Sequence, residues 1–98
     1  MNGSDTTRSY LVECYWPGVS AEALHAAAQR TRKAASDLQS EGADVDFISS
    51  ILVVVDETVF CLFRGCEADV RAASTRAGVQ FERVLESVRA DGRTEENE

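Results

Sequence analysis

Residues 45–65 constrain the fold most, because they hold two apolar runs that are rich in β-branched and aromatic side chains. Turn-forming polar residues, Asp56-Glu57-Thr58, separate the two runs, so we predict a β-hairpin. Both faces of each predicted strand are apolar, which a strand requires only where both faces of its sheet are covered. The first run holds Phe47, Ile48, Ile51, Leu52 and Val53 to Val55, and the second extends from Val59 to Phe63.

A chain of 98 residues forms one domain with one core, and its own helices can cover only one face of a sheet. The second face of the hairpin is therefore expected to meet another subunit or a ligand. Apolar residues at 44% and charged residues at 28% are typical of a globular protein. The formal net charge of −7 argues against binding to nucleic acid, which draws its affinity from clustered Lys and Arg.

Membrane and secretory segments are not expected. No apolar run approaches the roughly 20 residues that a bilayer span needs, and residues 1–9 lack the apolar core of a signal peptide. We therefore expect a cytoplasmic protein. We predict disordered ends at residues 1–8 and 90–98, the second an acidic tail, on either side of one domain at residues 9–89.

The rest of the chain predicts an α+β fold of the ferredoxin-like kind. A strand at residues 9–16 ends at Pro17-Gly18, and Ser20 then offers an N-cap to a long amphipathic helix that begins at Ala21 and stops at Gly42. After the hairpin, a second helix begins at residues 65–66 and closes at Gly78, and a fourth strand covers residues 80–89. The order βαββαβ predicts a four-stranded antiparallel sheet with both helices on one face and the first and third strands in its centre.

The three cysteines lack metal-ligand spacing. Cys14 and Cys61 lie inside apolar strand runs, where free cysteines pack as small hydrophobes. Cys66 lies at a strand-to-helix junction, where a helix N-terminus can lower a thiol pKa, although a structural cysteine is the simpler interpretation. His25 lies outside the apolar stripe of its helix and is expected at the surface. With one histidine and no metal-ligand spacing among the cysteines, we predict neither a metal site nor a cofactor.

The candidate ligand-binding residues are placed on the sheet face opposite the helices. Alternation along the first strand separates Tyr10, Val12, Cys14 and Trp16 from Leu11, Glu13 and Tyr15, and we assign the second set to that face. Glu86 is expected beside Glu13 on a neighbouring strand, with Arg64 able to pair with either carboxylate. Two such carboxylates can hold a cation or transfer a proton, whereas the simpler alternative is an ion pair of Glu13 with Arg64 and a solvated Glu86. Tyr15 and its neighbour Trp16 either stack on a ligand at a cavity mouth or pack under a loop.

The segments YLVECYWPG, SAEAL, VFCLFRG, RAG and ERVLESV resemble a small actinobacterial family of unknown function that includes nickel-binding ferredoxin-like proteins. The resemblance extends from about residue 10 to residue 88 and implies a ferredoxin-like homodimer. It also implies metal binding by His-rich members of the family. This chain differs from those members, because the positions where histidine ligands are expected hold Ala28, Ser49, Ala73 and Ala77. We therefore do not extend nickel binding from the family to this chain.

Three hypotheses for the function follow. The first is a non-enzymatic homodimer whose paired sheets enclose a cavity for a small ligand. The second is a cofactor-free dimeric-barrel enzyme, an oxygenase or isomerase acting on a small cyclic substrate, with Glu13 as acid/base and Tyr15, Ser49 and Arg64 assisting. The third is residual metal binding through Glu13, Glu86 or His25.

Overall fold

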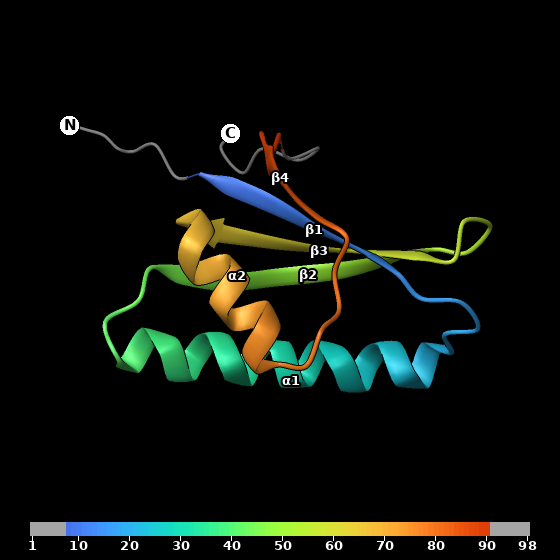
Figure 1. The fold of residues 1–98 in the computed structure, drawn as a ribbon, viewed down its shortest axis with the longest axis horizontal. Helices are drawn as coiled ribbons and strands as arrows, with labels where there is room; N and C mark the ends of the chain where they lie inside the picture. Colours follow the sequence, from blue (N-terminus) through green and yellow to red (C-terminus); the bar gives the residue numbers. More distant parts are fainter. Residues whose placement is uncertain (1–7, 91–98) are drawn as a thin grey trace, which may run out of the picture.

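Four strands and two helices follow one another in the predicted order in the computed structural model, which describes residues 8–90 (Figure 1). Within this range neither helix combines the length and the apolar character that a membrane span needs. The elements are β1 (Ser9–Tyr15), α1 (Ala21–Ser40), β2 (Val45–Val53), β3 (Thr58–Gly65), α2 (Glu67–Arg76) and β4 (Arg83–Ser87).

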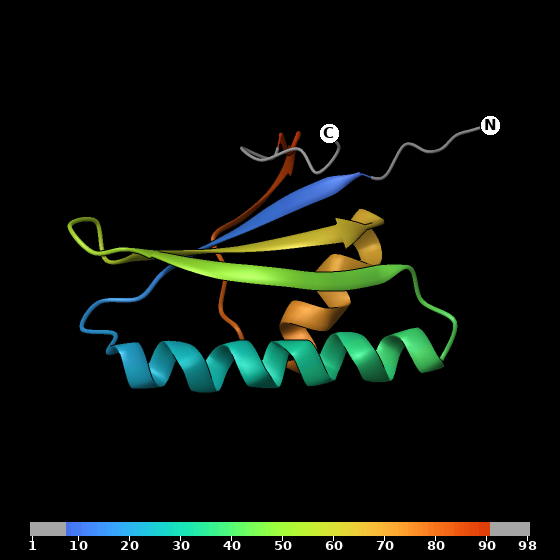
Figure 2. The ribbon, with the colours of Figure 1, turned by 180° about the vertical axis from the view of Figure 1, so that it is seen from behind.

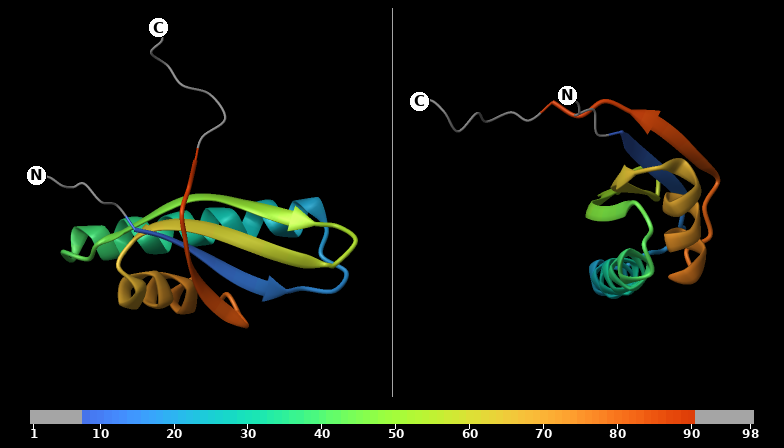
Figure 3. Two further views of the ribbon diagram at one scale, coloured as in Figure 1. Left: turned by 90° about the horizontal axis from the view of Figure 1, so that it is seen from above. Right: turned by 90° about the vertical axis from the view of Figure 1, so that its left-hand side faces the viewer.

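The strands form one antiparallel sheet in the order β2-β3-β1-β4, so the first and third strands are central, as predicted. Viewed from behind, β2 forms one edge of this sheet and runs along α1 (Figure 2). At the other edge β4 pairs with β1, with Ser87 opposite Ser9. Both helices lie on the same face of the sheet (Figure 3).

The two faces of the central strands differ as the sequence predicts. On β1, Tyr10, Val12 and Cys14 are buried beneath the helices, whereas Leu11 and Glu13 alternate with them on the opposite face. On β3 the buried set is Val59, Cys61 and Phe63. We call the face opposite the helices the free face. Its apolar residues are Leu11, Tyr15, Ile51, Val53, Phe60, Leu62 and Leu85.

Helix α1 begins as predicted, because the Ser20 hydroxyl accepts a hydrogen bond from the backbone N–H of Ala23 at 3.0 Å. The buried face of this helix consists mainly of small side chains, which allow it to lie close to the sheet. The buried residues of α1 are Ala27, Thr31, Ala34, Ala35 and Leu38.

The strands are shorter than predicted at three places. Val54 and Val55 lie in the β2–β3 turn, 76% and 88% exposed, because the N–H groups of residues 56 and 57 bond back to the carbonyls of residues 53 and 54. Trp16 follows β1 instead of continuing it. The predicted strand at residues 80–89 is confined to Arg83–Ser87.

The predicted disordered ends, residues 1–8 and 90–98, lie outside the described residues apart from residues 8 and 90.

Candidate functional site

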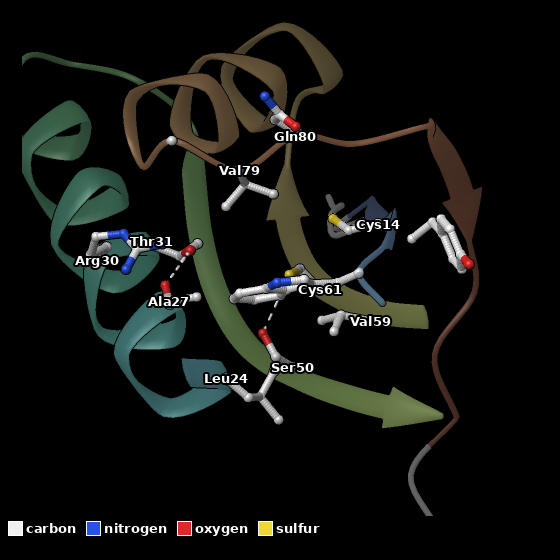
Figure 4. Close-up of a pocket in the computed structure, with 13 residues that line it drawn as sticks. Cys14, Leu24, Ala27, Arg30, Thr31, Ser50, Val59, Cys61, Val79 and Gln80 are labelled. Atoms are coloured by element: carbon white, nitrogen blue, oxygen red, sulfur yellow. Dashed lines mark hydrogen bonds between the residues drawn. The ribbon is translucent and has the colours of Figure 1, made fainter. Parts of the chain in front are cut away.

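A cavity of about 250 Å³ lies between the N-terminal half of α1 and the sheet (Figure 4). Its sheet side, which we call the floor, includes Cys14, Ser50 and Cys61, and its helix side includes Leu24 and Thr31. The cavity of the first hypothesis would lie on the free face, between the sheets of two chains. The α1 cavity is a separate space, on the helix face of one chain.

The unequal lengths of the two helices account for this space. α1 has 20 residues and α2 has 10, so α2 covers only part of the sheet beside α1. Beyond the end of α2 the chain continues as Gly78, Val79 and Gln80, which line the cavity. The side chain that α1 places over the floor at residue 27 is an alanine, too short to fill the gap.

Two thiols meet on the floor. Val12 pairs with Cys61 and Cys14 pairs with Val59, so the two cysteines are diagonal neighbours on the central strands and point to the same side. The Cys14 thiol donates a hydrogen bond to the carbonyl of Val12 at 3.9 Å, and each of the two thiols affects the acidity of the other. Ser50 stands opposite Cys61 on β2, and its hydroxyl donates a hydrogen bond to the Cys61 sulfur at 3.3 Å.

This arrangement separates the acidities of the two thiols. The neighbouring Cys14 thiol, together with the hydrogen bond from Ser50, lowers the pKa of Cys61 to about 7, against the opposing effect of burial. The pKa of Cys14 is raised, first by the neighbouring Cys61 thiol and second by burial. Cys61 is therefore the more readily ionised thiol of the pair.

The cavity lining also includes an aromatic ring and a cation. Trp16 lines the cavity, and its backbone N–H donates to the carbonyl of Glu57 at 2.8 Å, which ties it to the hairpin turn. Arg30 also lines the cavity, and its Nε donates to the carbonyl of Ala77 at 3.1 Å. No acidic partner of Arg30 is found between residues 8 and 90.

The predicted free-face charges are not arranged as expected. Glu13 pairs with Arg83 at 2.6 Å across β1 and β4, instead of with Arg64. Arg64 pairs with Asp46 on β2, also at 2.6 Å. Glu86 stands opposite Tyr10, on the parity of the helix face, and is exposed at the sheet edge, so it does not lie beside Glu13. The register of β4 separates the two carboxylates that the sequence analysis placed together.

Tyr15 is the one predicted ligand-binding residue that borders the α1 cavity, at the end of β1, although its strand position and its 57% exposure place it on the free face. Ser49 is exposed on the free face opposite Leu62. His25 is exposed on α1, as expected. The Cys66 thiol donates to Asp69 at 3.1 Å and the carboxylate raises the pKa of this cysteine, which agrees with a structural cysteine and not with a helix N-terminus that lowers the pKa. Arg64 lines a second hollow, beside residues 43–46.

The positions where metal-binding relatives were expected to carry histidine do not form a cluster. Ala73 on α2 and Ala77 at the C-cap of that helix are buried, whereas Ser49 is exposed on the free face. Within residues 8–90 no group of three or more His, Cys, Asp or Glu side chains is placed to hold a metal ion.

The sequence analysis did not identify the dithiol site as such. Alternation along the strands correctly buries Cys14 and Cys61. The predicted order also makes their strands neighbours. The pairing register, which places the two thiols and Ser50 together, is the information that the pattern lacked. Arg30 was not a candidate site residue in the sequence analysis, because a charged residue off the apolar stripe of a helix is expected to face solvent.

Comparisons with known proteins show the fold alone. No protein-family model matches the chain, and no curated protein matches it. Among solved structures, the crystal structure of SCO4226 from Streptomyces coelicolor A3(2) is similar, with a TM-score of 0.67 and 20% sequence identity. The similarity covers 85% of this chain and 99% of that protein's chain.

Proposed function

We propose that this chain is a non-enzymatic binding protein that takes a small organic ligand into the α1 cavity. The observation that supports the proposal is the cavity itself, about 250 Å³ and lined by Trp16, Leu24 and Val79 among its apolar side chains. An apolar cavity of about 150 Å³ is enough to bind benzene, so this one has room for an aromatic ring with a small substituent.

Arg30 favours a ligand that carries a carboxylate. Its Nε is used by the carbonyl of Ala77, which fixes the guanidinium group beside the cavity and leaves its terminal N–H groups for an anion. An aromatic monocarboxylate would place its ring beside Trp16 and its charge at Arg30. This class of ligand combines the apolar body and the single anion that the cavity offers.

Fluorescence of Trp16, the one tryptophan of the chain, tests the proposal directly. Benzoate is expected to change the emission in a saturable manner, and benzamide, its uncharged counterpart, to bind more weakly. Substituting Arg30→Gln is expected to weaken benzoate binding by about 10- to 150-fold, because a hydrogen bond to a charged group contributes about 1.5–3 kcal/mol. The control is Arg32→Gln, an exposed residue of α1 that does not line the cavity. If neither probe binds by fluorescence or by calorimetry, up to its solubility limit, the proposal is wrong.

We also propose that two copies of the chain associate through their free faces. Ile51 and Tyr15 are 58% and 57% exposed there, in a surface that also holds Phe60 and Leu62 from the central strand. Such an isologous contact would cover the second face of the hairpin. Light scattering after size exclusion is expected to give the dimer mass, and Ile51→Lys the monomer mass. A monomer of the unsubstituted chain at micromolar concentration would exclude the dimer.

We propose in addition that the arrangement is the ferredoxin-like split one and that the chain acts in the cytoplasm as a relative of the actinobacterial family. The central position of β1 and β3 and the placement of both helices on one face support the fold proposal. Glu13 does not favour the enzyme hypothesis, because it is ion-paired with Arg83 and does not line the cavity.

A further inference from the structure

Beyond the proposed organic ligand, we infer that Cys14 and Cys61 bind one soft monovalent cation, Cu(I) or its analogue Ag(I), between their two sulfur atoms. The inference begins with geometry. The two thiols are diagonal neighbours on adjacent strands, face the same side of the sheet and both line the α1 cavity. A cation between the two sulfur atoms replaces their protons and keeps the same two groups facing each other.

Access and ligand type favour a soft cation. Both cysteines line the α1 cavity, so an ion that enters it reaches their sulfur atoms even though each residue is buried within the fold, at 4% and 5% exposure. Thiolates are soft ligands that suit Cu(I), zinc and iron–sulfur clusters. A structural zinc site requires four donors, and no third His, Cys, Asp or Glu joins this pair in the part of the chain that the structure describes. Two donors suit the linear coordination that d10 monovalent ions adopt.

The surrounding charges also fit the bound state. A bis-thiolate complex of a monovalent cation carries one negative charge, and Arg30 lies on the wall of the same cavity without an acidic partner among residues 8–90. The Ser50 hydroxyl, 3.3 Å from the Cys61 sulfur, continues to donate a hydrogen bond to the thiolate in the complex.

The binding step conserves electrons. Each metal–sulfur bond replaces an S–H bond, the proton of that thiol passes to solvent, and the ion keeps its oxidation state. No oxidant or reductant is required once the cation is supplied in its monovalent form.

Titration of the full-length, reduced protein with Ag(I), and with Cu(I) under anaerobic conditions against a competing chelator, tests the inference. We expect one ion per chain and a change in Trp16 fluorescence, because this ring lines the same cavity. Cys14→Ala and Cys61→Ala are each expected to weaken binding at least 100-fold. Cys66→Ala is the matched control, since its thiol lies outside the cavity at the start of α2, and its affinity should be unchanged.

X-ray absorption of the Cu(I)-loaded, unsubstituted protein gives a second measurement that does not depend on variants that fold. Two sulfur neighbours and no nitrogen are expected. The inference is wrong if the copper has fewer than two sulfur neighbours or if Cys66→Ala removes binding. It is also wrong if Cys14→Ala and Cys61→Ala each leave the affinity for the cation unchanged. Benzoate binding depends on Arg30 and the cation depends on the thiols, so either proposal can fail without the other.

Discussion

Phe63 and Phe60 lie on the same strand but on opposite faces, and substituting them one at a time measures what each face contributes. Phe63 is fully buried at 0% exposure and makes an edge-on contact with Phe47, with ring centroids 5.4 Å apart. Phe60 is half-buried on the free face. We expect Phe63→Ala to lower the free energy of unfolding by about 3–5 kcal/mol, the range for a buried aromatic residue.

Loss of the aromatic contact with Phe47 places the expected value in the upper part of this range, because such pairs contribute about 0.5–1.5 kcal/mol beyond area burial. A small domain has only about 5–15 kcal/mol of stability, so the variant retains a folded population only if the parent lies well above the lower limit. Phe63→Leu, with an expected cost of about 1–2 kcal/mol, is the variant that keeps the fold in either case.

Urea denaturation followed by Trp16 fluorescence and far-UV circular dichroism is the assay. With a cost of about 4 kcal/mol and a slope of about 2 kcal/mol per molar urea, Phe63→Ala shifts the midpoint by about 2 M. Phe60→Ala should cost about 1 kcal/mol at low protein concentration, because only part of the side chain is buried. Its cost should grow with concentration if the free face is a dimer interface. A loss for Phe60→Ala that equals that for Phe63→Ala at low concentration would refute the assignment of the faces.

Three further predictions concern single interactions. Gly65→Ala should destabilise the fold by more than the roughly 1–3 kcal/mol that an unfavourable backbone conformation costs. Gly65 has φ +133°, and a Cβ there would also collide with the backbone carbonyl of Asp44. Asp69→Asn should lower the midpoint of thermal unfolding at pH 7. Its carboxylate accepts the backbone N–H of Asp44 at 2.8 Å, which lowers the Asp69 pKa below 3.8, so the stabilisation is complete above that pH and is lost as the pH falls through the folded-state pKa. A double-mutant cycle on Glu13 and Arg83 should give about 0.2–1 kcal/mol, decreasing with salt, since the pair is partly exposed.

Each of these has its own control. Gly18→Ala also places a side chain at positive φ but meets no atom within 4 Å, so an equal cost at Gly65 would show that the collision is unimportant. Asp37→Asn, which removes an exposed pair with Lys33, should leave the acid limb of the stability curve unchanged. A pH-independent effect of Asp69→Asn would contradict the carboxylate explanation. A coupling energy for the Glu13 pair that did not respond to salt would contradict the assignment as a surface ion pair.

The sequence patterns predicted the features of single strands and helices better than they predicted how these elements pair with one another. Alternation on β1 correctly separated Leu11 and Glu13 from Tyr10 and Val12, because the period of a strand is fixed by its backbone. The partner of Glu13 was predicted incorrectly, since it depends on which residue of β4 stands opposite, and a shift of one position exchanges Arg83 for its neighbours. The same dependence on register explains why the dithiol floor was not predicted. The volume of the cavity depends on how far α2 extends over the sheet, which the sequence pattern does not give.

The pairing of β1 with β4 also determines how the fold responds to force. Ser9 and Ser87 stand opposite each other, so the two ends of the described chain leave the sheet at the same end of this strand pair. Pulling the termini apart therefore acts along the interstrand hydrogen bonds, which lie perpendicular to antiparallel strands. The bonds break one after another from Ser9 toward Glu13, in the manner of a zipper, instead of sharing the load. We expect β4 to peel away at low force, with the contact between Glu13 and Arg83 the last of the pair to part.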